Sequence, residues 1–283
     1  MDAGMLLLAR FGLMADLALL MGLPLFWWAM GMAGQRALLV ALALGGMALS
    51  ALWLLASAAS MTGTPLLPPD WATAEILLTM TPIGPVLVVR GVALLAALVL
   101  AVAGQDRWVL IPAAVAAATI AWTGHAGATE DVAGSVHRAA DVAHIWAASG
   151  WIGALAALLH AVTARRPNID RVAVMLAKFS LLGTLFVATL VMTGVVNSLM
   201  IVGVADLPAL VGSRYGWLLG AKLAVFGAML GLAALNRWRL TPALERGAEG
   251  AIAALRLSLL LETGAAIGIL VLVAGLGTLD PLA

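Results

Sequence analysis

Long apolar runs, separated by short charged or Gly/Pro-rich breaks, dominate this sequence and constrain what it can fold into. Each run has about 20 residues or more, the length that an α-helix needs to cross the hydrocarbon core of a bilayer. Hydrophobic residues make up 64% of the chain and charged residues only 10%, which is too little charge to cover a water-soluble protein. The sequence therefore predicts an all-α, polytopic membrane protein.

The apolar runs predict a bundle of eight transmembrane helices. Their approximate ranges are 5–31, 36–62, 74–103, 108–126, 138–163, 174–201, 215–237 and 251–277. Pro82 and Pro85 are expected either to kink the third range or to separate an interfacial helix, Trp71 to Met80, from the span itself. The connections are too short for a second soluble domain, so residues 1–283 are predicted to form a single transmembrane domain.

The positive charges of the connections predict the orientation, because cytoplasmic loops carry an excess of Lys and Arg. One set of alternate connections carries eight arginines: Arg36, Arg107, Arg165, Arg166, Arg171, Arg237, Arg239 and Arg246. The opposite set carries two, Arg138 and Arg214. The first set is therefore expected in the cytoplasm, and both termini on the opposite side of the membrane.

Histidine is concentrated in one short stretch on that opposite side. The chain has four histidines and no cysteine, and three of them are His125, His137 and His144. His137, Asp141 and His144 are spaced i, i+4 and i+7, so at about 100° per residue they share one narrow face of a helix. Imidazole suits Cu(II) and also binds Cu(I), and a nearby carboxylate can orient a ligating ring. The pattern indicates a metal site. The plainer alternative is that these groups only hydrogen-bond between helices.

Two segments resemble the copper resistance protein D (CopD) family. The first holds Thr123-Gly-His125 and the run from His137 to Gly153. The second runs from Lys178 to Pro242 and includes Thr193-Gly-Val-Val-Asn197 and Lys222. The resemblance is closest over residues 122–242. The first 120 residues resemble the family in helix count and in the spacing of Thr81, Gly84 and Arg90.

The resemblance implies a multi-pass protein of the bacterial inner membrane that serves copper homeostasis and resistance. It also implies movement of copper across that membrane, commonly by uptake, and a periplasmic copper-binding partner of the CopC type. Both termini and the histidines are then expected to be periplasmic, with copper, as Cu(I) or Cu(II), bound by His125, His137 and His144. Haem is not expected, and the net charge of +1 gives no indication of nucleic-acid binding.

Further residues could assist an ion near the outer face or along a path through the bundle. Candidates for an assisting role are Asp141, Asn197, Glu130, Asp131, Met61 and Met80. Methionine supplies a soft ligand for Cu(I), although thioethers are more often ordinary packing groups. His160 is expected at the opposite, cytoplasmic end of its helix, as an interfacial residue.

Four charged residues are expected within the membrane: Asp16, Arg90, Lys222 and Glu262. Charges in hydrocarbon are costly and are usually paired or functional. Depth along the helices favours the pairs Asp16–Arg90 and Lys222–Glu262. A place for these groups in a permeation path is an equal alternative.

Two other functions remain open from the sequence. A b-type haem protein needs two histidines that face each other on neighbouring helices. His125 and His144 could serve, although His125 ends its helix. A structural or assembly subunit would use the histidines only for packing. No nucleotide-binding or Ser-His-Asp pattern occurs in the chain, so an enzyme is not expected.

Overall fold

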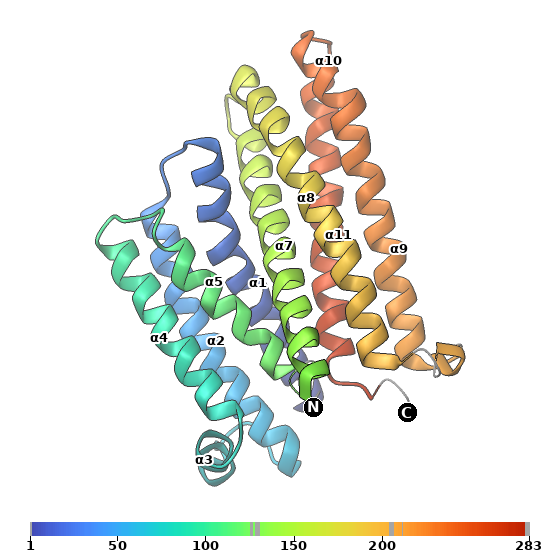
Figure 1. The fold of residues 1–283 in the computed structure, drawn as a ribbon. Helices are drawn as coiled ribbons and strands as arrows, with labels where there is room; N and C mark the ends of the chain where they lie inside the picture. The colour runs from blue at the N-terminus through green and yellow to red at the C-terminus, as the bar shows by residue number, and fades with distance from the viewer. Residues whose placement is uncertain (1, 125–126, 128–130, 204–206, 211, 281–283) are drawn as a thin grey trace.

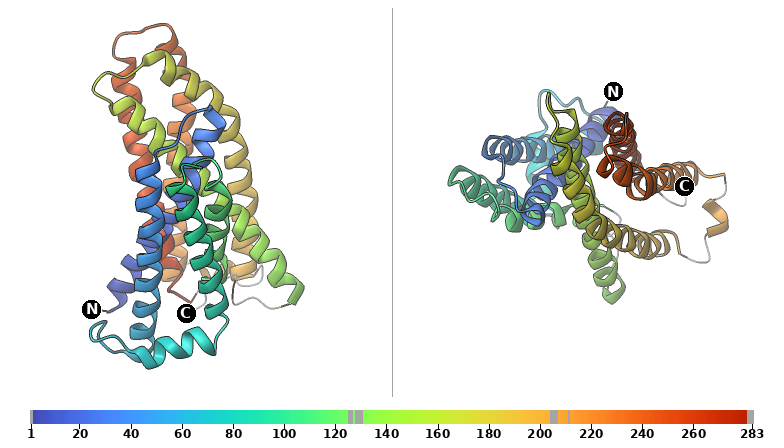
Figure 2. Two further views of the ribbon diagram at one scale, coloured as in Figure 1. Left: turned by 90° about the vertical axis from the view of Figure 1, so that its left-hand side faces the viewer. Right: turned by 90° about the horizontal axis from the view of Figure 1, so that it is seen from above.

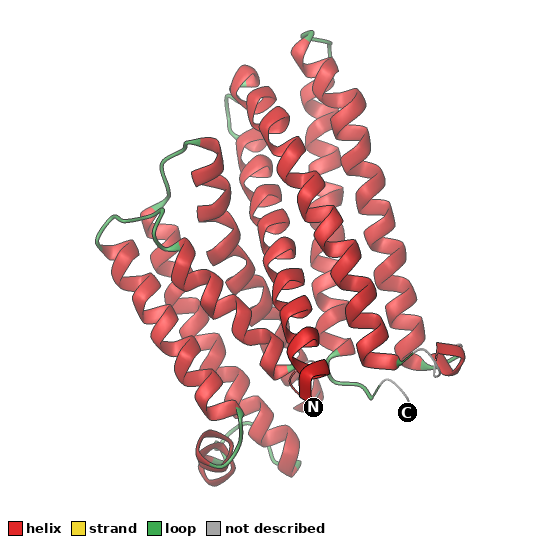
Figure 3. Cartoon of the chain, in the orientation of Figure 1, coloured by secondary structure: helices red, strands yellow, loops and turns green. Residues whose placement is uncertain are grey.

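The computed structural model describes residues 2–124, 127, 131–203, 207–210 and 212–280, and every regular element in them is a helix (Figure 3). Seven of the described helices are long and apolar enough to cross a membrane. They are α1 (Asp2–Met30), α2 (Arg36–Thr62), α4 (Ile83–Val102), α7 (Asp131–Thr163), α8 (Ile169–Val202), α9 (Arg214–Leu235) and α11 (Ala251–Leu276). The predicted all-α polytopic membrane fold is confirmed.

The fourth predicted span is shorter than the thickness of the hydrocarbon core. α5 (Leu110–Ala118) and the 3-10 helix η1 (Thr119–Thr123) form one apolar stretch, Leu110–Thr123. At 1.5 Å per residue this stretch is about 21 Å long, whereas the hydrocarbon core is about 30 Å thick. It nevertheless runs from the upper to the lower end of the bundle in Figure 1, obliquely between α4 and α7.

The third predicted range forms two separate helices, as the two prolines allow. α3 (Trp71–Thr79) lies across the lower end of the bundle, and α4 begins after Pro82 (Figure 1). Asp70 caps α3, since its carboxylate accepts hydrogen bonds from the Thr73 amide at 3.0 Å and from the Thr73 hydroxyl at 2.8 Å. These bonds favour the ionised carboxylate and lower the pKa of Asp70 below its ordinary value.

Two helices continue past the apolar runs that predicted them. α7 is helical from Asp131, ahead of the predicted start near residue 138, and residues 128–130 before it lie outside the described ones. The seventh span is followed without a break by the π-helix η3 (Asn236–Leu240) and by α10 (Thr241–Glu245). A short 3-10 helix, η2 (Leu207–Leu210), precedes α9.

Successive spans run in opposite directions, so the described N- and C-terminal ends lie at the same end of the bundle (Figures 1 and 2). The connections that carry the eight arginines lie at the other end. The number of membrane crossings stays a prediction, because seven described helices are long enough to span and Leu110–Thr123 is shorter. The side of the membrane that each end faces stays a prediction.

The centre of the bundle is the crossing of α1 with α7. A Cβ atom on Gly22 would lie 1.9 Å from the carbonyl oxygen of Ser149, and one on Gly153 would lie 2.1 Å from the carbonyl carbon of Gly22. Only glycine allows backbones to approach this closely. α7 therefore lies between α1, α2, α4 and α5 on one side and α8, α9 and α11 on the other (Figure 2).

Candidate functional site

Three polar side chains of α7, those of His137, Asp141 and His144, lie along one face in the half of the helix nearer the chain termini (Figure 1). His137 is buried, with 1% of its surface exposed, and Asp141 and His144 are partly buried. Their spacing of four and three residues stacks them over two helical turns, as the sequence predicts. A polar row in this position packs against neighbouring helices and is largely shielded from lipid.

His144 is held by a threonine of α8. Its Nδ1 atom lies 2.9 Å from the hydroxyl oxygen of Thr193. That hydroxyl donates its only hydrogen to the carbonyl oxygen of Thr189 at 2.6 Å, so toward the ring it accepts and Nδ1 donates. The hydrogen bond therefore assigns the lone pair of the neutral imidazole to Nε2, the nitrogen that can coordinate a metal ion.

The ring of His144 also lies close to a glycine of α8. A Cβ atom on Gly194 would lie 3.7 Å from Cε1 of His144, an ordinary van der Waals contact. Cε1, the ring carbon between the two nitrogens, therefore lies beside Gly194 of α8.

Asp141 is held by α8 and α9 together. Asn197 donates its amide to Oδ1 of Asp141 at 3.0 Å, and Lys222 lies close enough to interact electrostatically with both Asp141 and His144. The site thus combines an imidazole, a carboxylate, an amide and an ammonium group from three helices. The carboxylate and imidazole attract a metal cation, and the ammonium balances the carboxylate charge in the absence of metal.

Of the predicted three-histidine site, the structure describes His137 and His144. His125 and Glu130 lie outside the described residues, and Asp131 is the first residue of α7. Within the described ranges, no three His, Asp or Glu side chains are grouped closely enough to hold one metal ion. Coordination by His125 together with His137 and His144 stays a prediction.

The predicted methionine ligands lie apart from this face. Met61 and Met80 are 70% and 80% exposed, near the ends of α2 and α3, and no described contact joins either one to His144. They share the end of the bundle that holds the chain termini, so an outer role for them stays a prediction. His160 is exposed near the far end of α7, where the sequence places it.

The predicted pair Lys222–Glu262 is wrong. Lys222 lies beside Asp141, and the carboxylate of Glu262 accepts a short hydrogen bond from the amide of Asn236. Glu262 is 2% exposed and Asn236 is 6% exposed. Depth along a helix fixes the height of a side chain but not its direction around the helix, and direction decides which partner it meets.

The predicted pair Asp16–Arg90 is wrong for the same reason. The carboxylate of Asp16 packs against Gly45 and Gly46 of α2, where a Cβ atom would come within 2.8 and 2.9 Å of its oxygens. Arg90 instead donates through Nε to the hydroxyl of Thr119 at 2.7 Å. Neither charged group forms an ion pair with a described residue.

Two members of the site were not anticipated from the sequence: Thr193 as the partner of His144, and Lys222 as the neighbour of Asp141. A signal for Thr193 was present. It precedes Asn197 by four residues, so the two share a face of α8, as Asp141 and His144 share a face of α7. Lys222 is predicted as a charge within the membrane, but the sequence does not indicate Asp141 as its neighbour, because the two lie on different helices.

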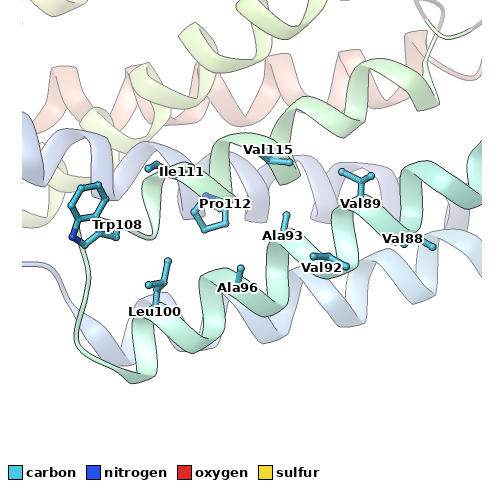
Figure 4. A pocket seen from close by; sticks show the side chains of 10 residues that line it. All are labelled: Val88, Val89, Val92, Ala93, Ala96, Leu100, Trp108, Ile111, Pro112 and Val115. Carbon is cyan, nitrogen blue, oxygen red and sulfur yellow. The ribbon is translucent and has the colours of Figure 1, made fainter.

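A groove between α4 and α5 is a poor alternative site. Its lining, which includes Val89, Ala96 and Pro112, is apolar throughout (Figure 4). It opens on the outer surface of the bundle, away from α7. These side chains offer no metal ligand, so the groove is suited to lipid.

Comparisons with known proteins cover both halves of the chain. A model of the family "Copper resistance protein D" matches residues 173–276, and one of the "Copper resistance protein D-like, N-terminal domain" matches residues 1–135. Inner membrane protein YebZ of Escherichia coli (strain K12) is 28% identical over 163 residues, which cover 57% of this chain and 55% of that protein. No solved structure matches the chain.

A relative that matches over a longer stretch is Copper resistance protein D of Pseudomonas syringae pv. tomato. It is 38% identical over 304 aligned positions, which cover 96% of this chain and 95% of that protein. An identity of this level over nearly the whole length, with family models on both halves, is sufficient to assign the family. This chain belongs to the copper resistance protein D family of polytopic membrane proteins.

Proposed function

We propose that this protein binds copper at the His144–Asp141 site and transports it across the bacterial inner membrane, by uptake from the periplasm. The observation that carries the proposal is the hydrogen bond between Nδ1 of His144 and Thr193, which leaves Nε2 to coordinate an ion. Asp141, one turn away on the same face, attracts the ion. The names of one relative and of the matching family model, which refer to copper resistance, support copper as the cargo.

The position of the site supports entry from the periplasm. α7 begins at the end of the bundle that holds the chain termini, and the eight arginines lie at the opposite end (Figure 1). Under the bias of positive charge toward the cytoplasm, His137, Asp141 and His144 lie in the periplasmic half of the membrane. Copper arrives there from solution or from a CopC-like periplasmic protein.

In the proposed site, Lys222 and copper take turns in compensating the charge of Asp141. Without copper, its ammonium group compensates the charge of Asp141. A copper ion that binds Asp141 and His144 takes over that compensation, and Lys222 compensates Asp141 again when the ion leaves. The carboxylate is therefore never left alone in a medium where an unpaired charge is costly. The proposed role is transport, with no catalytic step.

Copper uptake into proteoliposomes tests the proposal. Radioactive copper is added outside vesicles that carry the purified protein, and the trapped label is counted over time. Wild-type protein should accumulate label, whereas His144→Ala and Asp141→Asn should accumulate little more than empty vesicles. His160→Ala, at the other end of α7, serves as the control. Equal uptake by wild-type and His144→Ala protein would refute transport through this site.

A visible spectrum of the same preparation separates the copper protein from a haem protein. Bis-histidine haem gives a strong Soret band, and a copper-binding protein without haem gives none. A stoichiometric Soret band that is lost in His144→Ala would favour electron transfer over copper transport.

A further inference from the structure

α4 and α9 begin in the same way, although their spans lie in different halves of the chain. α4 opens with Thr81-Pro-Ile-Gly84 and α9 with Ser213-Arg-Tyr-Gly216, and a basic residue follows each glycine by six positions: Arg90 and Lys222. In both helices the hydroxyl accepts a hydrogen bond from a first-turn backbone amide. Both helices rise from the end of the bundle that holds the termini, after a short helix, α3 or η2 (Figure 1).

The backbone around the two glycines is also alike. A Cβ atom on Gly84 would lie 1.8 Å from the carbonyl oxygen of Leu78, and one on Gly216 would lie 2.0 Å from that of Leu210. In each case the oxygen belongs to the residue six positions earlier. The two helix starts therefore have equivalent geometry, and Arg90 holds in the N-terminal half the position that Lys222 holds in the C-terminal half.

The two basic groups differ in their partners. Lys222 has the carboxylate of Asp141. Arg90 is fully buried, at 0% exposure, with its guanidinium carbon 5.8 Å from the ring centre of Trp53. Its Nε atom bonds to Thr119, but Nη1 and Nη2 have no hydrogen-bond partner among the described residues. Within the described part of the chain, no carboxylate compensates this charge.

A buried cation without a counter-charge is unfavourable in a low-dielectric interior. A guanidinium group presents its terminal N–H donors as a fork that binds anions well. Arg90 lies seven residues into α4, about 10 Å along the axis from the helix start at the end where the termini lie (Figure 1). We propose that Arg90 is the centre of a binding site for a small monovalent anion, such as chloride, which compensates Arg90 as Asp141 compensates Lys222.

Thermal unfolding in two salts tests the site. The purified protein in detergent is unfolded in sodium chloride and in sodium gluconate at equal ionic strength, since gluconate is too large for the site. In chloride the wild-type Tm should be higher by about 2 °C or more and should saturate with chloride concentration. Arg90→Gln should lose this difference. Arg256→Gln is the matched control, because Arg256 already donates to the carbonyl oxygen of Val162.

Iodide quenching of tryptophan fluorescence provides a second measurement that does not depend on a folded Arg90 variant. Iodide bound at Arg90 would lie beside Trp53 and quench it at low concentration. Trp53→Phe should therefore remove a saturable component of the quenching. Equal Tm values of the wild type in the two salts, or a chloride effect that persists in Arg90→Gln, would overturn the proposal. Identical quenching curves for wild-type and Trp53→Phe protein would also overturn the proposal. That result is expected if only water contacts Arg90.

Discussion

Asn197 donates its side-chain amide to Asp141 at 3.0 Å, and this bond ties the polar face of α7 to α8. His144, three residues further along α7, bonds to Thr193, four residues earlier on α8. Because the helices are antiparallel, the two bonds lie one turn apart and fix a single register between them. In that register the polar groups face one another, which shields them from lipid.

Replacement of Lys222 should change the stability of the copper-free protein and its affinity for copper in opposite directions. Lys222→Met removes the cation that compensates Asp141, so the copper-free protein should unfold at a lower temperature. Copper should bind more tightly, by about tenfold if the lost competition amounts to about 1.4 kcal/mol. Thermal unfolding and copper titration measure both effects, with Lys178→Met, at an exposed position of α8, as the control. Weaker copper binding by Lys222→Met would show that Lys222 does not compete for Asp141.

The Asn236–Glu262 pair should contribute to stability. Both side chains are buried, and either replacement by alanine leaves the partner without its hydrogen bond. Such a loss costs about 1–3 kcal/mol for a buried polar group. Each single variant should therefore lower the Tm, and the double variant should cost less than the sum of the two. Glu75→Ala, at an exposed position of α3, should leave the Tm unchanged. Strict additivity would argue against the pairing.

The α1–α7 crossing should tolerate no side chain. Gly153→Ala places a Cβ atom 2.1 Å from the backbone of Gly22, so the two central helices must move apart. We expect a lower yield of folded protein and a lower Tm. Gly91→Ala is the matched control, because nothing lies within 4 Å of its added Cβ atom. A Gly153→Ala variant as stable as Gly91→Ala would contradict the close crossing.

The sequence predicts the helices well because the length and hydropathy of a span are local properties. It also places His137, Asp141 and His144 on one face, since the period of a helix is fixed. It does not predict which helix faces which, and so it misplaces the partners of Lys222 and Arg90. The helical residues of α7 that precede position 138 are not predicted, because hydropathy marks the membrane boundary and not the end of helical hydrogen bonding.

The orientation of the bundle can be measured independently of copper. A reporter that is active only in the cytoplasm should be silent when fused at the C-terminal end and active when inserted at Gly247, between α10 and α11. The reason is the excess of arginines at the end that holds Gly247. An active C-terminal fusion would reverse the orientation and place the polar face of α7 in the cytoplasmic half.

Copper content of purified protein tests the central claim most directly. Wild-type, His144→Ala and His160→Ala proteins are loaded with copper, separated from free metal and analysed for metal per chain. We expect bound copper in the wild type and in His160→Ala, and little or none in His144→Ala, with all three eluting as folded protein. His137→Ala and His125→Ala should show smaller losses. Unchanged copper stoichiometry and affinity in folded His144→Ala would contradict the account and place the site elsewhere, with the outer methionines Met61 and Met80 the next candidates.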